Sequence, residues 1–200
     1  MQNEFVSIKP GTLLAPVPAV MVSCQRPSEK PNIITVAWAG TVCSDPPMCS
    51  ISVRKERYSY DIIRETGEFV INLCGQGQLK AMDYCGVRSG RNEDKFSACG
   101  LTAASVDGLI APAIAQCPLH LGCKVESFVP LGSHDLFIGR ITALGVSKAL
   151  MDESGRIDFG KAQLVAYNHG VYYALGQALG FFGYSVAAPD VLARRMKELK

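Results

Sequence analysis

Three side chains that suit a phosphate group lie close together in the first third of the chain: Arg54, Arg57 and Ser59. Guanidinium groups and a hydroxyl group donate strong hydrogen bonds to phosphate oxygens. They come directly before an expected helix, Tyr60–Glu65, whose free amide groups add partial positive charge at this end. Ser59 is expected to cap that helix, and Gly67 to end it. The arrangement favours an anion site, although solvated arginines beside an ordinary serine cap would produce the same pattern.

Two further side chains stand where the chain is expected to hold them in place. Lys95 ends a polar loop and stands directly before Phe96, which is expected to anchor its backbone. His134 begins a predicted strand, where a histidine can form hydrogen bonds or handle a proton near neutral pH. Taken alone, a lysine in such a place is more often solvent-exposed. His120 and His169 have no comparable surroundings, and we expect no role for them.

The anion-site candidates are positioned by two predicted strands, joined by a corner at Asp45-Pro46-Pro47. The first strand, Ile33–Val42, alternates two kinds of side chain. The bulky ones are expected to face the core: Ile34, Val36, Trp38 and Val42. The small or hydroxylated ones leave room for a flat ligand, or for a second packing layer: Thr35, Ala37, Ala39 and Thr41. Because proline cannot continue a strand ladder, the chain turns at the corner and returns as a strand over Met48–Val53.

The rest of the chain predicts many short strands and few helices. Further strands are expected after a short arm within residues 12–24, at Glu68–Cys74, on both sides of a turn at Pro130–Ser133 within residues 119–149, and at Leu164–Tyr167. Helices are expected at Leu79–Cys85 and Pro189–Lys200. This pattern favours a mainly β barrel or sandwich in a single domain, residues 1–200. The glycine-rich motifs of dinucleotide-binding folds and of P-loops are absent from the sequence.

Composition excludes several classes of function. The chain has 200 residues and a formal net charge of +2, which is too neutral to indicate nucleic acid or a membrane surface as a partner. The sequence shows neither a signal peptide nor an apolar run that could span a membrane, so we expect a cytoplasmic protein. Its eight cysteines form no Cys-x-x-Cys pair, and most lie in apolar runs. We therefore expect small buried residues rather than disulfides or a metal site.

Several short motifs together resemble the flavin reductase-like family, and more closely its flavoredoxin branch. The resemblance covers roughly residues 10 to 175, and the combination is specific where each piece alone is not. The motifs are Asn32-Ile33-Ile34-Thr35-Val36-Ala37-Trp38, Asp45-Pro46-Pro47, Ser52-Val53-Arg54, Tyr58-Ser59, residues 66–73 (TGEFVINL), Gly90-Arg91, Asp94-Lys95-Phe96, and His134 before Ile138-Gly139-Arg140-Ile141.

The resemblance implies an FMN-binding split β-barrel with a Greek-key topology and short helices. It also implies a homodimer with FMN near the subunit interface, and the C-terminal tail, about residues 176–200, is expected to pack on the partner subunit. It assigns cofactor binding to Asn32, Thr35, Val36, Ala37, Trp38, Ser52, Val53, Arg54, Arg57, Ser59, Lys95 and Tyr167.

The resemblance also assigns roles within this set. Arg57 and Ser59 fall at the phosphate end, and His134 and Tyr167 fall around the ring. Lys95 falls on a loop over the flavin, where its charge would stabilise negative charge near N1 and O2 and raise the reduction potential. His134 would bind flavin or position a nicotinamide. The family often has Thr at the place of Ser59, which keeps the hydroxyl group, and Phe at the place of Tyr167, which lacks one.

The sequence is compatible with four functional hypotheses. The first is an FMN-dependent NAD(P)H oxidoreductase, with His134 as its catalytic residue and NAD(P)H as co-substrate. The second is an FMN electron carrier between redox proteins, without a nicotinamide site. The third is an enzyme like pyridoxamine-phosphate oxidase, for which the sequence shows no second basic cluster. The fourth is a flavin-free interaction domain, which a colourless protein would support.

Overall fold

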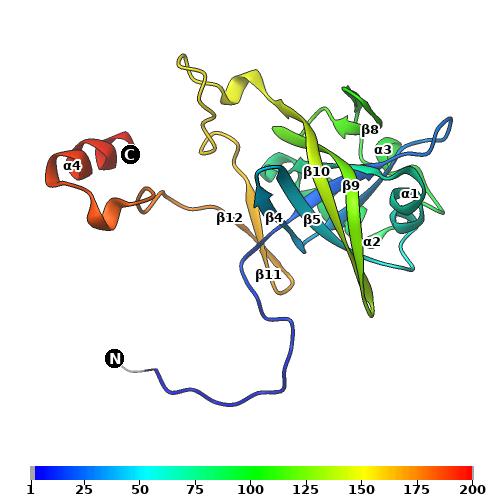
Figure 1. The fold of residues 1–200 in the computed structure, drawn as a ribbon, viewed down its shortest axis with the longest axis horizontal. Helices are drawn as coiled ribbons and strands as arrows, with labels where there is room; N and C mark the ends of the chain where they lie inside the picture. Colours follow the sequence, from blue (N-terminus) through cyan, green and yellow to red (C-terminus); the bar gives the residue numbers. More distant parts are fainter. Residues whose placement is uncertain (1–2, 200) are drawn as a thin grey trace.

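A computed structural model describes residues 3–199 of the chain, which fold mostly into β-strands (Figure 1). The strands are β1 (Val17–Pro18), β2 (Val20–Cys24), β3 (Asn32–Val36), β4 (Ala39–Ser44), β5 (Pro47–Arg54), β6 (Glu68–Leu73), β7 (Ala103–Val106), β8 (Leu109–Ile114), β9 (Leu119–Leu131), β10 (His134–Val146), β11 (Val165–Asn168) and β12 (Val171–Ala174). The α-helices are α1 (Tyr58–Thr66), α2 (Leu79–Val87), α3 (Lys95–Ala98) and α4 (Pro189–Glu198), and short 3-10 turns lie at Gln76–Gln78, Lys148–Leu150 and Tyr184–Val186.

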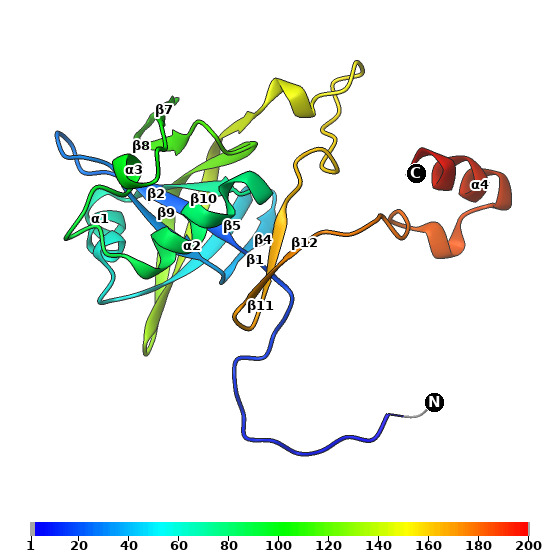
Figure 2. The same cartoon turned by 180° about the vertical axis from the view of Figure 1, so that it is seen from behind.

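The main sheet has its strands in the order β3-β2-β6-β9-β10-β5-β4, with every neighbouring pair antiparallel. Its two edges, β3 and β4, are consecutive in the chain and are joined only by Ala37 and Trp38. Such a connection spans at most about 11 Å from Val36 to Ala39, so the sheet must curl until its edges meet. The edges share no ladder, and the sheet is therefore a barrel that is split along this seam (Figures 1 and 2).

The predicted continuous strand over Ile33–Val42 is wrong, because the chain crosses the seam in its middle. Ile34 and Val36 are buried as expected, but Trp38 and Val42 are 44% and 50% exposed. Once the chain leaves β3 it joins the opposite edge as β4, so the alternation of β3 no longer sets which side chains face the core. The return strand at Met48–Val53 is confirmed as β5.

Helix α1 follows β5 and begins at Tyr58, two residues earlier than the sequence suggests. Arg57 occupies the N-cap position, so the prediction that Ser59 caps the helix is wrong. Ser59 lies in the first turn, only 1% exposed, where its hydroxyl accepts a hydrogen bond from the Asn32 amide. Gly67 ends the helix with φ 68°, the left-handed conformation that glycine adopts without strain, as predicted.

One buried amide joins two strands of the barrel to strand β8, which belongs to the separate β7–β8 sheet. The Asn72 amide nitrogen donates to the carbonyls of Met21 and Val70, at 3.1 and 3.2 Å, and to the Ser23 hydroxyl at 3.0 Å. Its side-chain oxygen accepts the Ile114 amide proton at 2.8 Å. The Asn72 side chain thus connects β2, β6 and β8 in a place that water does not reach.

The predicted long hairpin is confirmed as β9 and β10, joined at Gly132, and the last predicted strand is confirmed as β11. Two hairpin partners were not predicted. Strand β12 returns along β11, and β7 pairs with β8 to form a small apolar cluster with Val70 of β6. All eight cysteines are free thiols and six are buried, as expected of small apolar residues.

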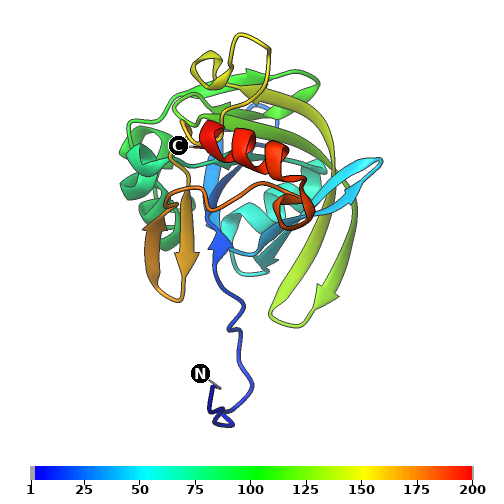
Figure 3. The same ribbon diagram turned by 90° about the vertical axis from the view of Figure 1, so that its left-hand side faces the viewer.

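Both ends of the described chain extend away from the barrel (Figures 1 and 2), and Figure 3 shows the N-terminal arm leaving it from a third side. The arm before β1 carries exposed apolar side chains such as Phe5 and Leu14, and the tail after β12 carries Leu179 and Phe182. The predicted terminal helix is confirmed as α4, except that Lys200 lies outside the described residues. No helix in residues 3–199 is both long and apolar enough to cross a membrane.

Candidate functional site

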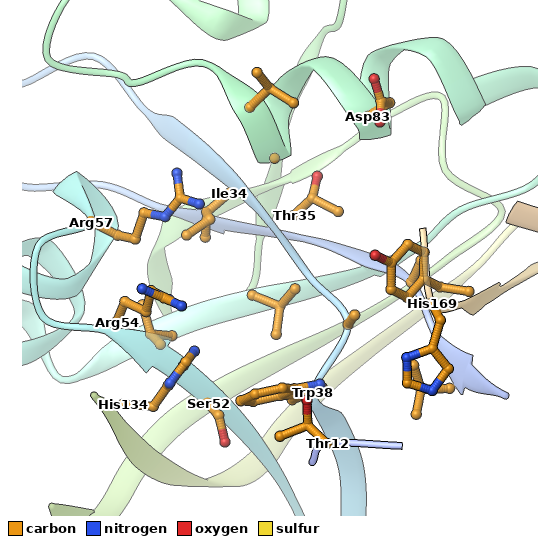
Figure 4. A pocket seen from close by; sticks show the side chains of 18 of the residues that line it. Thr12, Ile34, Thr35, Trp38, Ser52, Arg54, Arg57, Asp83, His134 and His169 are labelled. Atoms are coloured by element: carbon orange, nitrogen blue, oxygen red, sulfur yellow. The ribbon is translucent and has the colours of Figure 1, made fainter. Parts of the chain in front are cut away.

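The seam of the barrel opens into a cavity of about 520 Å³ (Figure 4). Residues Ile34 to Trp38 form one side of it, and β5 supplies the side that faces them. Residues from the N-terminal arm, α2 and the β11–β12 hairpin complete the wall. Ten of the residues predicted from the sequence line this cavity: Thr35, Val36, Ala37, Trp38, Ser52, Val53, Arg54, Arg57, His134 and Tyr167.

A second cavity, of about 320 Å³, adjoins the first and shares Ile34, Arg54 and Arg57 with it. The remaining predicted residues, Asn32, Ser59 and Lys95, line this second cavity. Its wall carries four cationic side chains and a single acidic one: Arg54, Arg57, Arg88, Lys95 and Glu56. The structure thus brings every residue of the predicted set to one continuous pocket with a cationic end.

Lys95 is buried at the cationic end and not on a loop over the larger cavity. It is the first residue of α3, and its Nζ donates to the carbonyls of Ile33 at 2.7 Å and of Cys85 at 2.8 Å. Burial lowers the pKa of Lys95, and repulsion from Arg57 acts in the same direction. Two of the three ammonium protons are therefore used by the backbone, and the third is available to an anion in the cavity.

A short chain of contacts fixes the Ser59 hydroxyl. The Asn32 amide donates to Ser59 Oγ at 2.8 Å, and both side chains are buried. Gly90 packs directly on Asn32, because a Cβ atom built at Gly90 would lie 2.0 Å from the Asn32 side-chain oxygen. Only glycine allows this close approach, and the sequence indicated Gly90 only as part of the Gly90-Arg91 motif.

His134 and Trp38 pack together at the wall of the larger cavity, with ring centroids 4.7 Å apart and planes tilted by 40°. His134 Nδ1 lies 2.9 Å from the Ser133 hydroxyl, with which it shares a hydrogen bond. Burial lowers the pKa of His134, and the charges of Arg54 and Arg57 lower it further. The imidazole is therefore neutral at neutral pH, and one ring nitrogen remains for a ligand.

Across the cavity from Arg54 and Arg57, the wall carries an acidic side chain and a histidine, Asp83 and His169 (Figure 4). Asp83 accepts a hydrogen bond of 3.0 Å from the Tyr172 hydroxyl, and the pKa of Tyr172 is raised to about 12 by burial and by this carboxylate. His169 also lines this side, although the sequence indicated no role for it. His169 lies in the turn between β11 and β12, and strand β12 was not predicted from the sequence.

His169 occupies a turn position that disfavours it. The hairpin turn His169-Gly170 has positive φ at both residues, 43° and 93°, a geometry for which Asn-Gly is the preferred pair. We expect His169→Asn to raise the free energy of unfolding by about 0.5 kcal/mol, which thermal unfolding would show as an increase in Tm of about 1–2 °C. Gly170→Ala should lower Tm in the same assay. A lower Tm for His169→Asn would show that the imidazole makes contacts that outweigh the strain.

Within residues 3–199, no group of three or more His, Cys, Asp or Glu side chains is placed to hold a metal ion.

The profile of the flavin reductase like domain matches residues 13–176, which is most of the chain. Among solved structures, the flavoredoxin of Desulfovibrio vulgaris (Miyazaki F) is similar with a TM-score of 0.84 and 32% identity, over 92% of this chain and 99% of that one. The match therefore covers both the barrel and the pocket.

Two curated relatives match shorter stretches. FMN reductase (NADH) RutF of Pseudomonas syringae pv. syringae is 33% identical over 101 residues, which are 49% of this chain and 54% of that protein. High molecular weight rubredoxin of Moorella thermoacetica is 31% identical over 107 residues, 52% of this chain and 45% of that protein. The split barrel, the pocket and the match over residues 13–176 lead to one conclusion: the chain belongs to the flavin reductase-like domain family.

Proposed function

We propose that this chain is an FMN-dependent NAD(P)H oxidoreductase, which reduces flavin or, through it, another acceptor. The observation that carries the proposal is the continuous pocket at the barrel seam. A cationic end suits a phosphate group, and the adjoining cavity has the small residues Thr35 and Ala37 that a flat ring needs. The similarity to flavin reductases and flavoredoxins supports the same cofactor.

The residues of the pocket fit FMN. Arg57, Ser59 and Lys95 would hold its phosphate, since their donors meet in the smaller cavity and Lys95 has an ammonium proton to spare. The backbone and side chains of residues 35–38 and 52–54 would hold the ring. Bound FMN would supply the two-electron chemistry, while the protein supplies binding, orientation and electrostatics.

His134 would act by binding and positioning. Its neutral imidazole stands at the wall of the larger cavity, where a ring nitrogen can hydrogen-bond the flavin or a nicotinamide. We assign it no role as an obligatory base, because hydride transfer requires no proton abstraction by the protein. Trp38 limits the freedom of the imidazole by packing on it.

Lys95 should make FMN binding depend on pH. A phosphate dianion favours the charged ammonium, so binding raises the pKa of Lys95 above its lowered value in the free protein. FMN affinity should therefore decline as the pH rises through the free protein's Lys95 pKa. It should also decline below about pH 6, where the phosphate gains a proton. Calorimetric titration of FMN and of riboflavin from pH 5 to 10 checks this, because riboflavin lacks the phosphate and should show neither decline.

A second function, as an FMN electron carrier between redox proteins, is favoured by specific relatives. One solved structure that resembles the chain is a flavoredoxin, and one curated relative is named as a rubredoxin. In this role FMN would stay bound, electrons would pass to a redox protein partner, and the chain would have no nicotinamide site of its own.

Absorption spectra distinguish the two functions. The purified protein is examined with and without added FMN, and then under anaerobic conditions with NADH, NADPH and finally dithionite. Fast bleaching of the flavin band by NADH or NADPH supports the oxidoreductase. Bleaching by dithionite alone supports the carrier. Absence of a flavin band under every condition would overturn both.

We also propose that two copies of the chain associate through the outer face of the β9–β10 hairpin. Leu131 pairs with His134 and Val129 with Leu136, so these side chains share a face with the cavity residues of β5 and β10. Val129 and Leu131 are 41% and 58% exposed on that face. The exposed apolar arm and tail, including residues 176–199, would add to the contact between the subunits.

Light scattering of the chromatographed protein tests the association. The wild-type protein should have the mass of a dimer, and the double variant Val129→Lys/Leu131→Lys should be a monomer, because two charges would be buried without partners. Leu144→Lys is the matched control, since Leu144 is 63% exposed near the other end of β10. A monomeric wild-type protein, or a dimeric double variant, would disprove this interface.

A further inference from the structure

We infer that Arg91 is a positioning residue that sets the width of the cationic cavity and so selects phosphorylated flavin over riboflavin. Arg91 is not among the residues that line either cavity, and its side chain is about half exposed. It acts on the cavity through the two chain segments that it joins. The inference rests on the proposed binding of FMN and adds the residue that determines its selectivity.

The Arg91 guanidinium connects two segments of the chain. One is the loop between α2 and α3, residues 88–94, and the other is the corner where β5 passes into α1, residues 55–59. Its Nη1 donates to the Glu56 carbonyl at 2.8 Å, and its Nη2 lies 3.5 Å from the Asp61 carboxylate. Its central carbon is 5.5 Å from the centroid of the Tyr58 ring. A planar guanidinium can make these contacts together, whereas a lysine ammonium cannot.

The two segments that Arg91 joins both line the cationic cavity. The corner supplies Arg57, Tyr58 and Ser59 to its wall, and the loop supplies Arg88, Ser89 and Gly90. The two segments also touch, because a Cβ atom built at Gly90 would lie 3.0 Å from the Tyr58 ring. Arg91 follows Gly90 directly in the chain, so its contacts hold the loop against the corner beside the cavity.

A second arginine also holds the corner. Arg26 lies 5.8 Å from the centroid of the same Tyr58 ring and forms a two-fold hydrogen bond with Glu65 of α1. Two guanidinium groups thus lie beside the Tyr58 ring. Because the corner is fixed in this way, loss of Arg91 would release the loop and leave the corner in place.

Movement of the loop would change the positions of the groups that donate hydrogen bonds to the phosphate. Gly90 packs on the Asn32 side chain, and Asn32 donates the hydrogen bond that orients Ser59 Oγ. If the loop withdraws, Asn32 gains freedom, and the hydroxyl and the cations of the two segments no longer converge on one point. Riboflavin has no phosphate, so its binding does not depend on that convergence.

Of the three Arg91 contacts, the pair with Asp61 should matter least. Both side chains are about half exposed, and solvent screens such pairs strongly. The hydrogen bond to the Glu56 carbonyl and the packing on Tyr58 are then the Arg91 contacts that hold the loop against the corner. Asp61→Asn should therefore change FMN affinity less than twofold, within the range of an exposed pair.

Calorimetric titrations with FMN and with riboflavin test the inference on the full chain. Arg91→Ala should raise the dissociation constant of FMN about tenfold and that of riboflavin less than twofold. Arg91→Lys keeps the charge but loses the planar guanidinium group, and it should still raise the dissociation constant of FMN about fivefold. Arg64→Ala is the matched control, because Arg64 packs on Phe128 and lines neither cavity.

Three outcomes would overturn the inference. Wild-type affinity of Arg91→Lys would mean that Arg91 acts only through its charge. Equal losses of affinity for FMN and for riboflavin in Arg91→Ala would mean general damage to the pocket. Unchanged FMN affinity in both Arg91 variants would show that Arg91 has no such role. A wild-type protein that binds no flavin would instead refute the proposed function, so the two failures are distinct.

Discussion

Replacing Lys95 with methionine is expected to raise the dissociation constant of FMN by at least about a hundredfold. The substitution removes a buried positive charge from the cationic cavity, where a hydrogen bond to phosphate is little weakened by water. It also leaves the carbonyls of Ile33 and Cys85 without their donor. Since β3 and α2 would then relax apart, the cavity would lose both charge and shape.

Calorimetry with FMN and riboflavin measures the effect, and Lys80→Met serves as the control. Lys80 is exposed on α2 and lines neither cavity, so its replacement should leave both affinities unchanged. Riboflavin affinity should decrease much less than FMN affinity in Lys95→Met. Unchanged FMN affinity in that variant would contradict the place given to Lys95 at the phosphate end.

Replacing Asn72 with alanine is expected to lower the free energy of unfolding by about 4 kcal/mol. The Ile114 amide and the Met21 carbonyl would lose their Asn72 partner, in a place that is fully buried. Each buried polar group without a partner costs about 1–3 kcal/mol, and the lost side-chain volume adds a cavity. Because β2, β6 and β8 meet here, the loss would affect the whole barrel.

Urea unfolding of the two proteins measures this difference in stability. Asn168→Ala is the matched control, since Asn168 lies exposed at the end of β11 and should cost no more than about 0.5 kcal/mol. A loss below about 1 kcal/mol in Asn72→Ala would mean that water or a rearranged side chain replaces the missing hydrogen bonds.

The elements that sequence patterns predicted correctly are those that local interactions determine. Gly67 ends α1 as its conformational freedom suggests, and the turn near Gly132 separates two strands as expected. The break after Val36 was missed, because it arises where distant strands close the sheet and leaves no local signal. Ala37 and Trp38 look like any other pair in an alternating strand.

The candidate residues of the site came from the family resemblance, while their arrangement in space required the fold. Lys95 lines the smaller cavity, and its hydrogen bonds to carbonyls of β3 and α2 place it at the cationic end. His169 was given no role because its neighbours in the sequence indicate none. Only the position of the β11–β12 hairpin brings it to the cavity wall.

The packing of Trp38 on His134 has a practical consequence, because Trp38 is the single tryptophan of the chain. Its fluorescence therefore reports on one wall of the larger cavity and on nothing else. A flavin in that cavity would quench the emission by energy transfer over a very short distance. Stopped-flow mixing can thus time the entry and exit of the cofactor without any label, and it shows directly whether FMN remains bound from one turnover to the next.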